Sequence, residues 1–547
     1  MLIGGFVGIC AHIFVAGIQY FEVFRSQKSH LFELFGVQVN LVTAGFLLAA
    51  YLVVMMVRKT SQMQKWESPA DIIYAAQNRT HEMEPKKGLL TIFASFISLA
   101  GGASLGQYGP LVHLGGAIGF AVAKEYRKAW LGRDVLIGCG VAAAIAAGFN
   151  APIAAIIFAH EAVLRHFSAR ALTLISIASI CASALNRLLF EPADIFIVNA
   201  DISVSAEIVG ISLIAGVIFG ISAIFIIRTL FLVQKLTSRS PRIFRWFAAA
   251  GLIHLLVLSQ TFPQVLGLGM GLINGLFSGG ETMQMLFFLL FAKLSAVILS
   301  ATIGFSGGFV GPALAIGALL GALLAHFAVV FGLSFLTTML VVSGSAAVAG
   351  TVFGAPLAMV ILVLELTHSY DLSLAAMLSI VVSTLIFHLF YGHSLFDLQL
   401  LARGVDLAKG RIFLELESTK MDTLISDDFL SFQPDTSADL IFSKMQNSQK
   451  TEGYCLDENG QFLGKISIFD VVSGSGKTAA SLATRDCLKL YSHQSINEAM
   501  KIAIDFVGEG LPVLESQSNK MVGVVSEAHL FEAYSTVNQK VREIETA

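Results

Sequence analysis

The chain has 547 residues, of which 55% are hydrophobic and 13% charged, with a mean hydropathy of +0.75 and a formal net charge of −3. Soluble domains carry about a quarter charged residues, so this composition excludes an ordinary soluble protein. The slightly negative charge argues against nucleic-acid binding. Runs of about 20 apolar residues span a bilayer, and long runs such as 211–233 recur before residue 405. We therefore predict an all-α, multi-pass membrane domain over residues 1–405.

Four segments marked by glycine and proline interrupt these apolar runs in a repeated order. GQYGPLVHLGGAIG at 106–119 resembles GGFVGPALAIGALLG at 307–321, and FNAPIAAIIFAHE at 149–161 resembles FGAPLAMVILVLE at 353–365. Irregular backbone at membrane depth must line protein or water rather than lipid. Corresponding interruptions in two halves of a chain point to a transport site at the interface between repeats.

The first motif of each half has the features of a helix that begins inside the membrane. Such a helix leaves its first N–H groups without partners, and these donors bind anions together with the positive end of the helix dipole. Gly109-Pro110 and Gly311-Pro312 fit this description, because glycine lets an ion approach and proline suits the first helical turn. The alternative is close helix packing through small residues, which would explain one motif better than four in repeated order.

The composition changes near residues 400–412, and the remainder is predicted to be a soluble α/β region. It contains two similar halves, at 421–472 and 480–537, each with the order strand, helix, strand, strand, helix. Between them, GSGKT at 474–478 resembles the end of a phosphate loop. Val471 stands where the full pattern needs glycine, so we do not assign nucleotide hydrolysis.

The sequence offers no catalytic or metal-binding pattern. The five cysteines are scattered without a CxxC pair, which predicts free thiols rather than a zinc site or a disulfide framework. His160-Glu161 does not begin an HExxH motif, because Leu164 occupies the position of the second histidine. We therefore expect a protein that is not an enzyme and needs no metal or other cofactor.

Together, the four membrane motifs resemble those of the CLC family of chloride channels and proton-coupled chloride transporters. The two C-terminal halves resemble a pair of CBS domains, so the resemblance covers nearly the whole chain. It implies an inverted repeat of broken, re-entrant helices and a homodimer in the plasma (inner) membrane, with chloride or a similar small anion as the transported ion. It also implies cytoplasmic CBS domains. The anion-pathway residues that it implies are Gly106, Gln107, Tyr108, Gly109, Pro110, Gly308, Phe309, Val310, Gly311 and Phe396.

Two departures from the family pattern concern protons. Tyr108 occupies the position of the glutamate in the family's GREGP loop, which gates the pathway and carries protons. A tyrosine stays neutral near pH 7, since its reference pKa is about 10. Ala162 occupies the position of an inner glutamate found in proton-coupled relatives. The neighbouring Glu161 and its counterpart Glu365 are predicted to be a structural pair or helix-end hydrogen-bond acceptors.

Two further departures remove hydroxyl groups. Phe396 replaces a tyrosine that donates to the anion in relatives. Trp66 falls where a serine is expected, with Ser68 as the alternative hydroxyl. These changes predict passive anion transport that is not coupled to protons. The alternatives are a proton-coupled antiporter that uses His113, and a closed sensor regulated by its CBS domains.

The CBS-like halves raise the question of a nucleotide ligand. GKISIFD at 464–470 keeps a hydroxyl and an aspartate, Ser467 and Asp470, which resemble the groups that hold an adenine nucleotide in CBS domains. The second half keeps Ser526 but has His529 in place of the aspartate. We therefore expect at most one good adenine-nucleotide site, and the alternative is a purely structural dimerisation module.

Overall fold

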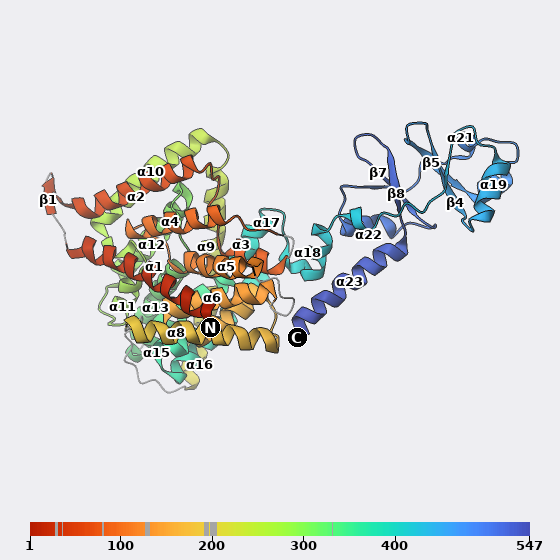
Figure 1. Ribbon diagram of the computed structural model, residues 1–547. Coiled ribbons are helices and arrows are strands. Elements are labelled where there is room, and N and C mark those ends of the chain that lie inside the picture. Colours follow the sequence, from red (N-terminus) through yellow and green to blue (C-terminus); the bar gives the residue numbers. More distant parts are fainter. Residues whose placement is uncertain are drawn as a thin grey trace. The chain divides into compact units, whose positions relative to one another are not determined.

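The computed structural model describes residues 1–27, 31–34, 37–78, 81–125, 132–190, 196, 205–330 and 332–546. The chain forms two compact units (Figure 1). The first comprises Met1–Gln77 and His81–Val405, and the second is built mainly from Asp406–Thr546.

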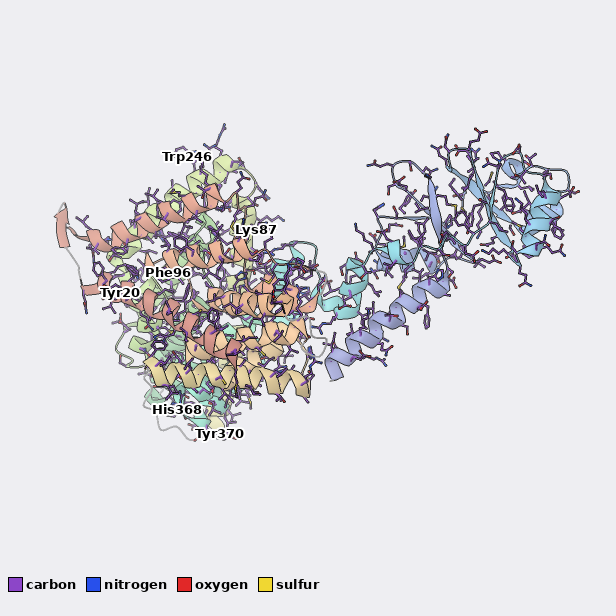
Figure 2. All side chains as sticks on the ribbon, viewed as in Figure 1. Tyr20, Lys87, Phe96, Trp246, His368 and Tyr370 are labelled. Carbon is purple, nitrogen blue, oxygen red and sulfur yellow. The ribbon has the colours of Figure 1, made fainter. Side chains whose placement is uncertain are left out.

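The first unit is helical, apart from a hairpin of β1 (Leu31–Leu34) and β2 (Val37–Asn40). Eight helices of the described ranges are long and apolar enough to cross a membrane. Exposed aromatic side chains such as Tyr20, Trp246 and Tyr370 lie on its surface, as expected at the border between lipid and water (Figure 2). Its α-helices are α1 (Leu2–Gln27), α2 (Leu41–Thr60), α3 (Pro69–Gln77), α4 (Pro85–Ala100), α5 (Tyr108–Glu125), α6 (Arg133–Phe149), α7 (Pro152–Phe158), α8 (Ala169–Phe190), α9 (Ala206–Thr237), α10 (Pro241–Thr261), α11 (Met270–Leu276), α12 (Met283–Ile303), α13 (Val310–Val330), α14 (Thr337–Phe353), α15 (Pro356–Thr367), α16 (Tyr370–Phe390) and α17 (Leu395–Leu401).

The two halves of this unit repeat the same packing. Helix α5 packs along α6 where Gly115 meets Gly140, and α13 packs along α14 where Gly317 meets Gly344. At each crossing, a β-carbon would collide with the backbone of the neighbouring helix, so the glycines permit close approach. Close helix packing therefore explains the glycines inside these helices. It does not explain the glycines in the loops that precede α5 and α13.

The second unit contains two small sheets with the same topology. In the first, β3 (Ser431–Phe432) is parallel to β4 (Glu452–Leu456), which is antiparallel to β5 (Phe462–Ser467). In the second, β6 (Leu490–Tyr491), β7 (Leu511–Leu514) and β8 (Met521–Val525) repeat this arrangement. The helices are α18 (Arg411–Ser418), α19 (Ala438–Asn447), α20 (Ile468–Ser473), α21 (Ala479–Leu482), α22 (Ile496–Ala503) and α23 (Glu527–Thr546).

Each half of this unit follows the predicted order of strand, helix, strand, strand and helix. The GSGKT segment connects α20 to α21 rather than following a strand. It therefore lacks the frame of a phosphate loop.

Candidate anion site

The first motifs of the two halves meet in the structure. Gly106 and Gly308 form an isolated antiparallel bridge, in which each N–H donates to the carbonyl of the other at 2.7 Å. Helix α5 begins two residues after this bridge, at Tyr108, and α13 begins two residues after it, at Val310. The bridge therefore places the N-termini of two equivalent half-helices side by side.

The loops before these helices approach so closely that only glycine fits. A β-carbon on Gly308 would lie 2.5 Å from the backbone nitrogen of Gly109, and one on Gly109 would lie 2.7 Å from the α-carbon of Gly308. Gly106 likewise lies against Gly311, whose nitrogen would be 2.9 Å from an added β-carbon. Among the described residues, the N–H groups of Gly109, Phe309 and Val310 have no hydrogen-bond partner. These amides are the donors that an anion could use.

Tyr108 lies in an apolar environment beside these amides. Its side chain is 2% exposed and stacks on Phe149 at the end of α6, with ring centroids 3.4 Å apart and planes 9° apart. A small pocket adjoins the stacked pair, and it is lined by Tyr108, Val112, Ile145, Phe149, Ala154, Phe158, Val310, Ala358, Met359 and Leu362. No charged side chain is among these lining residues.

Two more half-helices begin at the same pocket, and carboxylates cap both of them. The Glu161 carboxylate accepts hydrogen bonds from the Leu357 and Ala358 amides at the start of α15, at 3.0 and 2.8 Å. The Glu365 carboxylate accepts from Ile153 and Ala154 at the start of α7, at 2.9 and 2.8 Å. The prediction of paired helix-end acceptors is confirmed, and each repeat supplies the cap for the other.

The four helix starts therefore divide into two kinds. The Glu365 and Glu161 carboxylates accept from the first amides of α7 and α15 and oppose the dipoles of these helices. A transported anion would therefore find no free amides and no net positive potential at these two helix starts. Helices α5 and α13 keep free amides and have no carboxylate cap among the described residues. The sequence predicted an anion site at the starts of α5 and α13, and it stays a prediction. Within the described residues, no carboxylate compensates the dipoles of these two helices.

The remaining predicted side chains lie outside this pocket. Phe396 in α17 is buried against Phe353, with ring centroids 5.3 Å apart. The Ser68 hydroxyl contacts Asp71 and Gln399 at 3.3 and 3.0 Å, and the Trp66 indole donates to the Gly304 carbonyl at 2.8 Å. Phe396 therefore serves packing, and Trp66 serves a backbone contact.

Gln107 and Pro110 complete the predicted loop, and both are buried. The Oε1 atom of Gln107 has no hydrogen-bond partner within the described chain. His113, one turn further along α5, is 1% exposed, and its Nε2 lies 3.0 Å from Oε2 of Glu67. A buried imidazole and a half-buried carboxylate thus lie together one helical turn after Gly109.

The structure reveals two buried cations near the loops that the sequence analysis did not single out. Lys293 in α12 is fully buried, and Arg25 in α1 is 6% exposed. The sequence did carry a signal for Lys293, because a lone lysine inside the apolar run MLFFLLFAKLSAVILS is by default a candidate functional residue.

In the second unit, the predicted nucleotide-site residues flank the start of α20. The Ser467 hydroxyl accepts from the amide of Phe469 at 3.3 Å, and Asp470 is exposed in the first helical turn. The equivalent Ser526 accepts from the amide of His529 at 3.3 Å. Both serines therefore act as helix caps, and Asp470 is accessible to a ligand.

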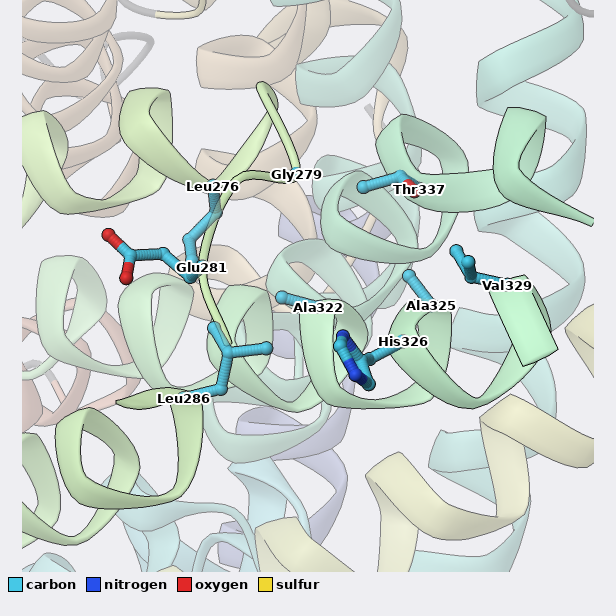
Figure 3. Close-up of a pocket in the computed structure, with 9 residues that line it drawn as sticks. All are labelled: Leu276, Gly279, Glu281, Leu286, Ala322, Ala325, His326, Val329 and Thr337. Atoms are coloured by element: carbon cyan, nitrogen blue, oxygen red, sulfur yellow. The ribbon is translucent and has the colours of Figure 1, made fainter. Parts of the chain in front are cut away.

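A second pocket lies at the other end of α13 (Figure 3). It is lined by Leu276, Gly279, Glu281, Leu286, Ala322, Ala325, His326, Val329 and Thr337. It contains none of the residues predicted for the anion pathway. The free helix starts and this pocket occupy opposite ends of the same helix.

Comparison with known proteins agrees with this geometry. Residues 45–388 match the family model described as voltage gated chloride channel, and residues 479–536 match the CBS domain model. A slow cyanobacterial Cl⁻/H⁺ antiporter has a similar structure, with a TM-score of 0.65 and 20% identity over 74% of this chain and 96% of that one.

Two further solved structures share the fold. A CLC-type fluoride/proton antiporter aligns with a TM-score of 0.60 and 22% identity over 73% of this chain and 95% of that one. A eukaryotic CLC transporter aligns with a TM-score of 0.64 and 17% identity over 96% of both chains. The family match spans more than half of the sequence, and the chain thus belongs to the voltage-gated chloride channel (CLC) family, with a CBS domain in its C-terminal region.

Proposed function

We propose that this protein carries chloride or a similar small anion across the membrane passively, without obligatory coupling to protons. The observation that carries the proposal is the start of α5, where free amides adjoin Tyr108 stacked on Phe149. A carboxylate at this position could compete with the anion and be neutralised by a proton. A tyrosine packed against a phenylalanine offers neither property near pH 7.

The other carboxylates near the pocket also argue against a proton route through them. Glu161 and Glu365 each accept two backbone hydrogen bonds, so each is committed to a helix cap. Ala162, at the position of the inner proton acceptor in relatives, carries no titratable group. The proposed pathway therefore has amide donors for the anion but no carboxylate placed to exchange with it.

The test uses purified protein in liposomes loaded with chloride, with a potassium ionophore to balance charge. We expect chloride efflux from the wild type and no proton uptake against a proton gradient. Proton uptake in a fixed ratio to chloride would contradict the proposal. Flux that is absent in the wild type and appears in Tyr108→Ala, but not in Tyr108→Phe, would indicate instead a closed protein with Tyr108 as a plug.

A second candidate is proton-coupled exchange, and the Glu67–His113 pair favours it. A histidine beside a carboxylate inside a membrane domain is by default a candidate functional site. The fold is shared with a Cl⁻/H⁺ and a fluoride/proton antiporter. If wild-type vesicles do couple the two fluxes, His113→Gln should abolish proton movement while chloride movement continues.

We also propose a homodimer in the plasma (inner) membrane, with the C-terminal unit in the cytoplasm. The orientation rests on Arg58 and Lys59, which end α2 and favour the cytoplasmic side. Cross-linking in native membranes tests the dimer, and protease access from each side tests the orientation. A monomer after cross-linking, or cleavage of the C-terminal unit from outside, would contradict these assignments.

For the CBS pair, we propose adenine-nucleotide binding at Ser467 and Asp470. Asp470 is exposed beside the capped start of α20, where it can accept from ribose hydroxyls. Adenosine triphosphate should raise the melting temperature of the wild type but not of Asp470→Ala. Equal shifts in both proteins would place the ligand elsewhere, and no shift in either would favour the structural dimerisation module.

A further inference from the structure

Lys293 is a buried basic residue whose amino group contacts no carboxylate in the described structure. Its side chain is fully buried within α12. Its Nζ atom donates to the carbonyls of Val265 and Gly267, at 2.9 and 3.3 Å. Across the described ranges, no ion pair within 4.0 Å joins Lys293 to an acidic side chain. Burying an ammonium group is costly unless an opposite charge compensates it, so this position calls for a negative partner.

The loop that Lys293 contacts lies between α10 and α11 and packs against the start of α13. The Leu268 carbonyl lies 3.1 Å from where a β-carbon on Gly311 would stand. In the same loop, the Gly267 amide donates to Gly102 at 3.2 Å and the Val265 carbonyl accepts from the Ser104 hydroxyl at 2.8 Å. Lys293 therefore holds a loop that contacts both the loop before α5 and the start of α13.

Arg25 places a second cation at the same junction. Its guanidinium group lies against Gly102, and its Nε atom has no hydrogen-bond partner in the described structure. Glu22, one turn earlier in α1, is the acidic neighbour. A β-carbon on Gly267 would lie 3.5 Å from its Oε1 atom and 3.9 Å from Nη2 of Arg25. Glu22 is thus the acidic side chain that the structure places beside the two basic residues at this loop.

Membrane topology does not explain these cations. Helix α1 ends near Arg25 and α2 runs back to Arg58 and Lys59. The positive-inside rule assigns the end of α2 to the cytoplasm, so the end of α1 faces the opposite side. Cationic residues on that side need another role.

We propose that Lys293 and Arg25 form a cationic pair that draws the permeant anion from the outer side toward the amides of α5 and α13. The pair acts through its electric field and not by contact, because low-dielectric surroundings strengthen the interaction between separated charges. The transported anion adds negative charge near Lys293, whose amino group contacts no carboxylate in the described structure. This inference rests on the proposed anion transport. It adds Lys293 and Arg25, which lie outside the glycine and proline motifs.

The experiment measures initial chloride efflux from proteoliposomes over a series of chloride concentrations, at constant ionic strength set by an impermeant anion. It compares the wild type with Lys293→Met, Lys293→Arg and Arg25→Gln. Lys235→Met is the matched control, since it removes the same charge from an exposed position at the end of α9. Melting temperature and elution profile in detergent report whether each variant folds.

Lys293→Met should raise the half-saturating chloride concentration roughly tenfold or more, as expected for loss of a nearby charge in a medium of reduced dielectric constant. Arg25→Gln should shift it in the same direction, while Lys293→Arg and Lys235→Met should stay within about twofold of the wild type. A folded Lys293→Met with an unchanged concentration dependence would overturn the proposal.

Two other outcomes would also decide the question. If Lys293→Met fails to fold, the chloride dependence of Arg25→Gln decides the question. If neither variant folds, the two residues have a structural role instead. If the wild type itself carries no chloride, the proposed transport function fails. If the wild type carries chloride and neither the Lys293 nor the Arg25 variants change the half-saturating chloride concentration, the cationic pair is refuted and the proposed transport function stands.

Discussion

Replacing either capping glutamate by glutamine should destabilise the membrane unit by about the same amount. Each carboxylate accepts two amide hydrogen bonds, at 2.8–3.0 Å, from the first turn of a half-helix in the other repeat. Glutamine offers one oxygen and no charge. Loss of one charge-assisted hydrogen bond costs about 1.5–3 kcal/mol, and loss of the charge–dipole attraction adds about 0.3–1 kcal/mol. We therefore expect about 2–4 kcal/mol for Glu161→Gln and a similar value for Glu365→Gln.

The measurement is equilibrium unfolding in mixed micelles, with Glu82→Gln as the control. Glu82 forms an exposed ion pair with Lys124 at 3.1 Å, and such pairs contribute about 0–1 kcal/mol. A difference of less than about 1 kcal/mol between the wild type and both capping variants would refute the reasoning. A large effect at only one of the two sites would refute the equivalence of the repeats.

The same variants separate a structural role from proton transport. Because Glu161 is committed to the start of α15, Glu161→Gln should change stability and leave the ratio of proton to chloride flux unchanged. A proton-coupled wild type that loses its proton flux in Glu161→Gln, without loss of stability, would show that this carboxylate carries protons.

Three further predictions concern the loop, the stacked tyrosine and the second unit. Gly308→Ala should destabilise the protein by about 1–3 kcal/mol, because its β-carbon would lie 2.5 Å from the Gly109 nitrogen; thermal unfolding tests this. Tyr108→Glu should make chloride efflux rise as the pH falls toward about 4, because a carboxylate competes with the anion until it is protonated; pH-independent efflux would contradict this. Tyr454→Phe should cost about 1 kcal/mol by removing the 2.9 Å hydrogen bond to the Gly510 carbonyl. Burial and the nearby Glu452 raise the pKa of Tyr454. The tyrosine therefore ionises first in the unfolded chain, and the free energy of unfolding of the wild type should fall above about pH 10. Tyr454→Phe should lack this part of the decrease.

Sequence reasoning predicted the repeat and its helix starts because glycine and proline mark them directly. The prediction placed helix starts at Gly109-Pro110 and Gly311-Pro312, and the helices begin within one residue of these glycines. The order of strands and helices in the C-terminal region was also predictable, because its two halves resemble each other in sequence. These features depend on local patterns that a single sequence contains.

The contacts between loops were not predictable in the same way. The repeat predicted that the two loops meet at one site. It did not predict that Gly106 would pair with Gly308, about 200 positions away, or that Tyr108 would stack on Phe149. The direction of a side chain depends on how the helices cross, which local composition does not specify. Lys293 lies inside an apolar helix and outside the glycine motifs, so the motifs that predicted the anion site did not include it.

The distribution of charge around the four helix starts links these observations. Glu161 and Glu365 neutralise the dipoles of α7 and α15, whereas the starts of α5 and α13 have only amides, with Lys293 and Arg25 near their loops. In a relative with a carboxylate at position 108, that group can neutralise the empty site. Tyr108 is uncharged near pH 7, so in the proposed mechanism a mobile anion neutralises these helix starts. The proposed site should therefore stay occupied at low chloride concentrations, and an anion should leave chiefly when another enters, as in pores with adjacent sites.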